Sequence, residues 1–321
     1  MKLVWKSPLH KAGEDLALNT FDVFNKPIML ENRIHYFCSA RDPNSKADPY
    51  LDQYVLAASF NTKTGEKKAA RLKMLPKGRS LSIPAYWEVS QVNGEIMINT
   101  GKYINAFEIE RYLTQSVVDG KIEWKRNERT RQYYASIIGY SEKGLAVISD
   151  SPVAEARVFN DAKSYTFGDH VVAIAKKSTR KLECRRNSDG KVCWTFVFVG
   201  YLYSKIEEKD GVIFFGTAGQ GGHFYGLKLE DGSLLHDINT HGTVHFSWYY
   251  DAVCLIDSKG NLLVYNPATK ATRYFELGNG LALHNEVNFL IQGDLLFAIV
   301  CQSIKKMEHE FDIFAVCIDL R

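Results

Sequence analysis

Hydrophobic and polar positions alternate over short runs along most of the chain, and glycine, asparagine or aspartate residues separate these runs. Apolar runs of this length, bounded by turn-forming residues, are typical of β-strands. The clearest unit lies after residue 200, with runs at 201–205, 211–216, 224–229 and 233–238. The pattern therefore predicts an all-β protein built from short strands and tight turns.

This unit of four strands is repeated. Its second strand begins near residues 211, 252 and 294, so the period is about 41 residues, which is the size of one β-propeller blade. The second strand is apolar on both faces, as expected when neighbouring sheets cover both of them. Further second strands are predicted at 32–38, 94–99 and 144–149. We predict that residues 1–321 form a single β-propeller domain.

The two ends of the chain are predicted to share one blade. The last unit ends after its third strand, and residues 2–7 have the form of the fourth strands at 191–196 and 121–125. An N-terminal strand that completes the last blade would remove the unpaired sheet edges. We predict seven four-stranded blades. Six blades with a hairpin inserted near 155–167 is the alternative, because residues 134–198 hold about seven strand-like segments.

Two segments carry a resemblance to a known superfamily. Lys191–Phe196 and Gly226–Leu235 resemble the quinoprotein-type (PQQ-like) propeller repeat, in which an apolar strand is followed by an Asp/Thr-Gly turn and by Lys-x-x-Trp. The resemblance extends over the chain and is specific in three or four blades. It implies the architecture alone, since this superfold carries enzymes, scaffolds and receptors. No quinone or calcium site is recognisable, so no quinone cofactor is expected.

Composition points to a soluble protein. Hydrophobic residues make up 45% of the chain and charged residues 24%, and the mean hydropathy is -0.22. No apolar stretch reaches the roughly 18 residues of a transmembrane helix, and residues 1–10 lack the apolar segment of a secretory signal. We therefore expect a cytoplasmic protein with no membrane contact, and a monomer is favoured.

The six cysteines lie mostly inside apolar runs, such as Ala252–Ile256. Such cysteines are typical of small buried hydrophobic side chains rather than of a disulfide framework. Cys184 and Cys193 could face each other across a hairpin and form a bridge, but free thiols are expected in a cytoplasmic protein.

The sequence contains no catalytic motif. It has no G-x-S-x-G, Walker loop, H-E-x-x-H or C-x-x-C pattern. Gly216–Gly222 is rich in glycine and follows a strand, but another strand follows it rather than a helix, so we interpret it as a flexible loop. We predict no catalytic residues, no metal ligands and no cofactor, and an enzyme is not the favoured interpretation.

Five of the nine histidines lie between residues 223 and 284. In a propeller, the connections from a fourth to a first strand and from a second to a third strand emerge on one side, here called the loop face. His223, His241 and His284 are expected there, and His245 begins the adjacent first strand. Glu286 lies two residues after His284 in the sequence, and Arg131 is a further polar candidate for the same site. These residues support an alternative hypothesis, an enzyme or a small-ligand or metal site at the mouth of the central channel.

Charge and long loops favour a different function. Residues 1–191 hold 31 Lys and Arg against 22 Asp and Glu, whereas residues 192–321 hold 9 against 15. A dipolar surface of this kind can steer a charged partner. The polar segment 41–50 is expected on the loop face. Aromatic and arginine side chains favoured at interfaces are found at Arg41, Tyr50, Tyr103, Arg129 and Arg131.

We therefore predict a non-catalytic binding scaffold that recruits a protein through the loop face. An acidic protein would suit the basic N-terminal half of the chain. Nucleic acid is not expected, because the isoelectric point of 8.4 falls short of the strongly basic balance of such domains.

Overall fold

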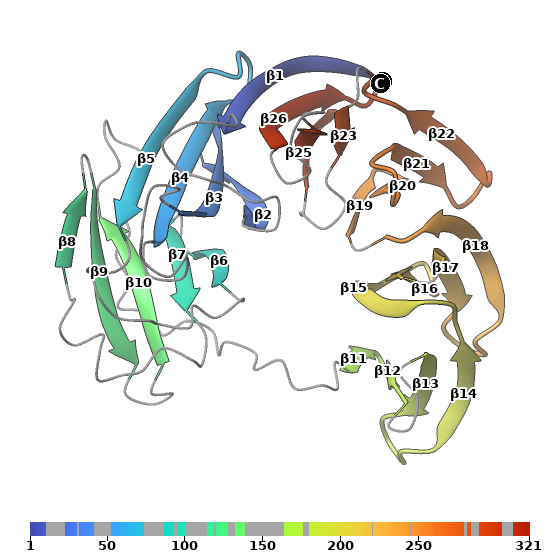
Figure 1. Cartoon of the computed structure of the whole chain (residues 1–321). Coiled ribbons are helices and arrows are strands. Elements are labelled where there is room, and N and C mark those ends of the chain that lie inside the picture. Colours follow the sequence, from blue (N-terminus) through green and yellow to red (C-terminus); the bar gives the residue numbers. More distant parts are fainter. Residues whose placement is uncertain are drawn as a thin grey trace. The chain divides into compact units, whose positions relative to one another are not determined.

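A computed structural model describes residues 1–10, 23–30, 32–41, 53–73, 87–92, 95–100, 114–117, 120–127, 132–138, 164–175, 180–219, 221–243, 245–278, 281–283, 289–303 and 311–321. The chain divides into two compact units. Unit 1 comprises Met1–Ala156 with Val287–Arg321, and unit 2 comprises Arg157–Glu286. Each unit is described by itself below (Figure 1).

Unit 1 contains three antiparallel sheets among its described residues. Sheet 1 runs in chain order through β2 (Val23–Leu30), β3 (Arg33–Arg41), β4 (Gln53–Asn61) and β5 (Lys67–Lys73). Sheet 2 contains β6 (Trp87–Val92), β7 (Glu95–Thr100), β8 (Thr114–Val117), β9 (Gly120–Asn127) and β10 (Gln132–Ile138). Sheet 6 contains β24 (Leu290–Gln292), β25 (Leu295–Ser303), β26 (Phe311–Asp319) and β1 (Lys2–His10).

Sheet 6 joins the two ends of the chain. β1 pairs antiparallel with β26, from Lys2 opposite Asp319 to His10 opposite Ile313. The amino group of Met1 donates a hydrogen bond to the carbonyl oxygen of Arg321 at 2.7 Å. β1 is an edge strand of this sheet, a place where a proline such as Pro8 is tolerated because its missing N–H need not serve the ladder. The predicted pairing of the N-terminal strand with the last C-terminal strand is therefore present.

Sheet 2 differs from the predicted meander. Its strand order is β6-β7-β10-β9-β8, so β9, which holds the segment 121–125, is the penultimate strand and not the outer one. Val117 pairs with Gly120, and only two residues connect β8 with β9. A connection this short pairs its two strands as a hairpin, so β8 occupies the outer edge beside β9.

Among the side chains that the structure describes, the core of unit 1 lies between sheets 1 and 6. Buried side chains from both sheets form one cluster: Trp5, Leu9, Ile34, Tyr36, Ala58, Phe60, Phe297, Ile299, Ile313, Ala315 and Cys317. The Trp5 indole stacks on Phe60, with ring centroids 6.1 Å apart. Its Nε1–H donates to the carbonyl oxygen of Thr62 at 2.9 Å. β1 therefore packs its tryptophan against the turn between β4 and β5.

Unit 2 contains three four-stranded antiparallel sheets in its described part, each with its strands in chain order. Sheet 3 contains β11 (Ser164–Phe167), β12 (His170–Ile174), β13 (Lys181–Arg186) and β14 (Val192–Val197). Sheet 4 contains β15 (Tyr201–Lys209), β16 (Val212–Ala218), β17 (Gly222–Lys228) and β18 (Leu234–His241). Sheet 5 contains β19 (Phe246–Tyr249), β20 (Ala252–Ile256), β21 (Leu262–Asn266) and β22 (Ala271–Phe275), and β23 (Leu281–Leu283) follows.

Sheet 4 is covered on both faces. On β16, Ile213 and Phe215 belong to a buried cluster shared with sheet 3. Phe214 lies between them in sequence and belongs to a cluster shared with sheet 5. Successive strand side chains point to opposite faces, so β16 contributes to two cores at once. This confirms the prediction that the second strand of a unit is buried on both sides.

Trp194 repeats in unit 2 the contact that Trp5 makes in unit 1. Its Nε1–H donates to the carbonyl oxygen of Leu229 at 2.7 Å. The indole lies against Gly232, in the turn between β17 and β18, so closely that a Cβ on this glycine would be 2.6 Å from its Cδ2. Both tryptophans therefore bind the third-to-fourth-strand turn of an adjacent sheet through one indole hydrogen bond and one close glycine contact, which is with Gly65 for Trp5 and with Gly232 for Trp194.

The all-β prediction is confirmed, since the described residues form six sheets that are each built from antiparallel strands. Sheets 3, 4 and 5 are four-stranded, follow one another and share buried cores, as the blades of the predicted repeat would. The count of seven blades and the single domain stay predictions, and the expected strand at 144–149 lies outside the described residues. No helix in the described part is long and apolar enough to cross a membrane.

His35 gives sheet 1 an expected pH dependence. Burial, and then the charge of Arg33, lowers the pKa of His35 to about 4 from its usual 6.5. Below pH 6.5 the His35 imidazole therefore becomes protonated in the unfolded chain but stays neutral in the native state. The free energy of unfolding consequently decreases as the pH falls towards 4. A shift of this size corresponds to about 3 kcal/mol. Urea unfolding of the wild type and of His35→Gln at pH 7.5 and 4.5 measures this loss of unfolding free energy.

The His35→Gln chain should lose less stability than the wild type over this interval, by up to about 3 kcal/mol. Equal losses in the two proteins would contradict a neutral, buried His35.

Candidate functional site

Most predicted binding residues fall outside the part of the chain that the structure describes in full. Arg41 ends β3, with its backbone opposite Gln53, and its side chain is not described. Six further residues lie outside the described ranges: Tyr50, Tyr103, Arg129, Arg131, His284 and Glu286. His223, His241 and His245 are described. The binding roles of all ten residues stay predictions.

His223 and His241 lie at the same end of sheet 4. The residue before His223, Gly222, pairs with His241. The connections 218–222 and 241–245 therefore start from adjacent strand ends, as the loop face requires. His241 is exposed and has a left-handed backbone, with a φ of 53°. His245 precedes β19 and is half-buried.

His223 is held by three neighbours. Its Nδ1 lies 2.5 Å from Oδ1 of Asp237, and its backbone N–H donates to Oγ1 of Thr217 at 2.8 Å. The imidazole stacks on Tyr225 with an interplanar angle of 8°. The Tyr225 hydroxyl in turn accepts a hydrogen bond from the N–H of Val199 at 3.1 Å. His223 is thus a fixed side chain that links β17, β18 and the connection between sheets 3 and 4.

The end of β14, this connection and the start of β15 expose a row of apolar side chains, here called the Val197–Tyr203 stripe. Its members are Val197, Val199, Tyr201 and Tyr203, with exposed fractions of 71%, 46%, 38% and 58%. Phe198, between two of them, is buried in the core of unit 2. Arg180 lies over the Tyr201 ring, 4.8 Å from the centroid to Cζ, and donates to its hydroxyl at 3.0 Å. The loop face of unit 2 thus carries exposed valines and tyrosines beside a guanidinium group.

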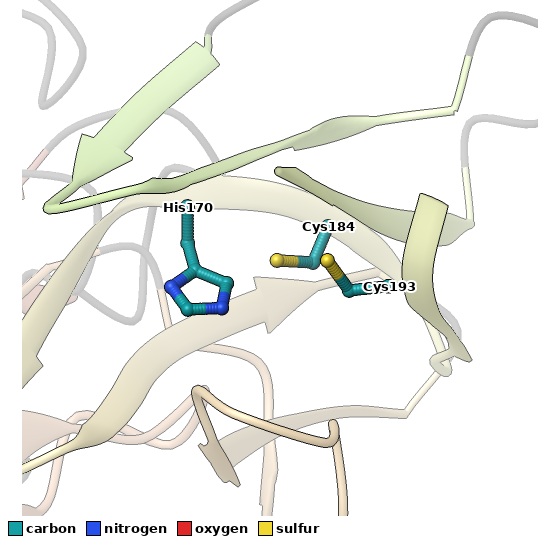
Figure 2. Close-up of side chains that lie close together, drawn as sticks. All are labelled: His170, Cys184 and Cys193. Atoms are coloured by element: carbon teal, nitrogen blue, oxygen red, sulfur yellow. The ribbon is translucent and has the colours of Figure 1, made fainter. Parts of the chain in front are cut away.

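A group of potential metal-ligating side chains lies at the opposite end of sheet 3. His170, Cys184 and Cys193 come from β12, β13 and β14, and their ligand atoms all lie within 4.8 Å of one another. Figure 2 shows the two sulfur atoms side by side and the imidazole next to them. This His-Cys-Cys group is the one cluster of at least three potential metal ligands within the described ranges.

Strand register explains why the three side chains meet. Cys184 pairs with Val172, two residues after His170 on β12, and residues two apart on a strand point to the same face. On β14, Cys184 pairs with Trp194 and Arg185 pairs with Val192. Cys193 is therefore the extra residue of a β-bulge, and a bulge redirects a side chain that would otherwise point to the other face.

Two tight turns hold this end of sheet 3. The turn between β11 and β12 has Gly168 with a φ of 57° as the first of its two residues, as in a type II′ hairpin. Asp169 ties it to the turn between β13 and β14. Its carbonyl oxygen accepts from Asn187 N–H at 2.7 Å, and its carboxylate accepts from Ser188 N–H at 3.0 Å. The backbone on both sides of the His-Cys-Cys group is therefore fixed.

The two thiols have unlike surroundings. Cys184 is fully buried in the core between sheets 3 and 4, whereas Cys193 is exposed. Burial, and then the neighbouring Cys193, raises the pKa of Cys184 to about 12. Both are free thiols in this structure, and they face each other across the β13–β14 hairpin.

No protein-family model and no curated protein matches this chain. Among solved structures, the chain is similar to the computationally designed Ika8 protein, at 8% identity and a TM-score of 0.39, over 97% of this chain and 100% of that one. It is also similar to BamB from Moraxella catarrhalis, at 11% identity and a TM-score of 0.37, over 98% of this chain and 99% of that one. A third similar structure is Saccharomyces cerevisiae Sqt1, at 10% identity and a TM-score of 0.38, over 95% of this chain and 98% of that one.

Sequence reasoning found the facing cysteines but missed His170 as their neighbour. The signal was present in the spacing. Gly168-Asp169 separates two strand-like runs, and this dipeptide predicts a two-residue hairpin. Counting back from the hairpin turn at 187–190 would have placed residue 170 beside residue 186. The bulge at Cys193 carries no comparable signal in the sequence.

Proposed function

We propose that this chain is a closed β-propeller that recruits a protein partner without catalysing a reaction. Seven blades remain our preferred count, with six as the alternative. Closure is supported by β1, which supplies the outer strand of sheet 6 and binds the turn of sheet 1 as β14 binds the turn of sheet 4. A closed ring of blades leaves only short, protected sheet edges and presents its loops to partners.

The Val197–Tyr203 stripe carries the binding proposal. Four consecutive odd-numbered positions expose apolar side chains while the positions between them are wholly or partly buried. Exposed apolar patches mark interaction surfaces, and tyrosine and arginine are the residues most often found at the energetic centre of interfaces. Arg180 beside Tyr201 suits an acidic partner.

A comparison of two double variants tests this proposal. Val199→Ser/Tyr203→Ser removes half of the stripe. Leu234→Ser/Tyr274→Ser is the matched control, because its side chains are similarly exposed, at 47% and 62%, on the outer strands β18 and β22. Affinity capture from the source cell with quantitative mass spectrometry should return one near-stoichiometric partner with the wild type and with the control. The stripe variant should retain less than about a tenth of it, since losing a central interface residue costs 2 kcal/mol or more.

Failure of the wild-type chain to retain any near-stoichiometric protein would oppose the binding function itself. Equal capture by both double variants would instead place the partner on another surface.

A further inference from the structure

The His-Cys-Cys group has the chemistry of a zinc site. Zn²⁺ prefers cysteine thiolate and histidine nitrogen ligands, and sites that exchange a fourth ligand use three protein groups. Two thiolates and one neutral imidazole carry two negative charges, which balance those of the ion. A neutral assembly suits a position where Cys184 is buried and His170 is half-buried.

The spacing of the ligand atoms fits this ion. Tetrahedral coordination with bonds of about 2.0–2.3 Å places ligand atoms roughly 3.3–3.8 Å apart. The three ligand atoms already lie within 4.8 Å of one another. Shifts of about an ångström or less in each ligand atom would bring the three atoms to this spacing. The hydrogen bonds of Asp169 to Asn187 and Ser188 hold the two turns in this arrangement.

The β-bulge at Cys193 is an independent feature that favours a site. A regular β14 would direct residue 193 away from Cys184. The bulge instead directs an exposed thiol towards a buried one, and bulges of this kind often serve to re-aim a functional side chain. Hydrophobic packing does not account for it, because the Cys193 side chain is exposed and not part of the core cluster.

We propose that His170, Cys184 and Cys193 bind one Zn²⁺ ion, with a fourth coordination position open to solvent on the side of Cys193. Zinc displaces a proton from each thiol and is neither oxidised nor reduced. The open position would accept water or one ligand atom from another molecule. The site lies at the turn end of sheet 3, away from the Val197–Tyr203 stripe in the same unit, and it does not depend on the proposed protein-binding function.

Cobalt and zinc titrations of the reduced full-length chain test this site. Co²⁺ should bind at one equivalent with the intense thiolate-to-cobalt absorption and visible bands of a tetrahedral complex, and Zn²⁺ should displace it. Loss of an outer-shell group costs about 10–100-fold in metal affinity, so loss of a ligand should cost more. We therefore expect Cys193→Ser and His170→Ala to weaken binding by more than a hundredfold.

Thr195→Ala is the matched control, because it removes an exposed polar side chain from β14, the strand that carries Cys193. This variant should bind cobalt as the wild type does. Cys193 is exposed, so Cys193→Ser should keep the wild-type circular dichroism spectrum and melting temperature, and its loss of binding would then not reflect unfolding.

Two results would overturn the proposal. The first is a reduced protein that binds no cobalt with thiolate absorption, together with a purified protein in which the two sulfur atoms are joined, which would make the pair a structural disulfide. The second is unchanged cobalt affinity in both Cys193→Ser and His170→Ala, which would place the metal elsewhere.

Discussion

Removal of residues 1–10 should leave a chain that does not fold stably. Trp5 and Leu9 are buried in the core between sheets 1 and 6, at 8% and 0% exposure. Truncating buried side chains of these types costs about 2–5 kcal/mol each. The free energy lost with both side chains and with the β1–β26 ladder approaches the roughly 5–15 kcal/mol by which a folded domain is stable. Thermal unfolding and size-exclusion chromatography of the truncated chain should show aggregation or a greatly lowered melting temperature.

Two controls isolate the role of β1. Leu3→Ala and Val4→Ala change partly exposed positions of the same strand, at 39% and 44% exposure, and should alter stability by no more than about 0.5 kcal/mol. A synthetic peptide of residues 1–10, added during refolding of the truncated chain, should restore the pairing with β26. A truncated chain that melts within a degree or two of the full chain would refute the structural role of β1.

Gly232→Ala should destabilise unit 2 much more than Gly190→Ala. Both glycines hold the same position in a third-to-fourth-strand turn, with φ of 72° and 68°. A side chain in this left-handed region costs about 1–2 kcal/mol. A Cβ on Gly190 would meet nothing within 4 Å, whereas a Cβ on Gly232 would lie 2.6 Å from the Trp194 ring. Overpacking adds about 1–3 kcal/mol. Urea unfolding of the two variants measures the difference.

A double-mutant cycle checks the cause. In a Trp194→Ala chain the indole is absent, so the additional cost of Gly232→Ala should fall to that of Gly190→Ala. The coupling energy between residues 194 and 232 should therefore be about 1–3 kcal/mol. A coupling near zero would mean that the glycine is required for its backbone conformation alone.

The periodic parts of the chain could be predicted because their signals are local. Apolar runs at 211–216, 224–229 and 252–256 correspond to β16, β17 and β20, since strand alternation depends on neighbouring residues. The partnership of β1 and β26 could be inferred because one unit lacked a fourth strand. The order of sheet 2 could not be inferred, because the placement of β9 depends on which edge of β10 pairs with it rather than on its own residues.

The candidate sites likewise contain features that the sequence predicts and features that it does not. The loop-face position of His223 and His241 follows from strand order, and the structure places both at one end of sheet 4. The exposure of Tyr203 could not be predicted from the sequence, because tyrosine is common both in cores and on surfaces. The His-Cys-Cys group depends on a bulge of one residue, which shifts register without changing the alternating pattern on which sequence reasoning relies.

The pairing of β1 with β26 also affects how the protein is made. β1 leaves the ribosome well before its partner, which is synthesised about 300 residues later. At about 5–20 residues per second, this delay is roughly 15–60 s. Throughout that interval β1 lacks its pairing strand, and Trp5 and Leu9 lack the part of their core that β25 and β26 supply. During this time β1 can pair with β1 or β26 of another chain. Synthesis rate and chaperone access should therefore control the yield of this protein more strongly than the stability of the finished sheets.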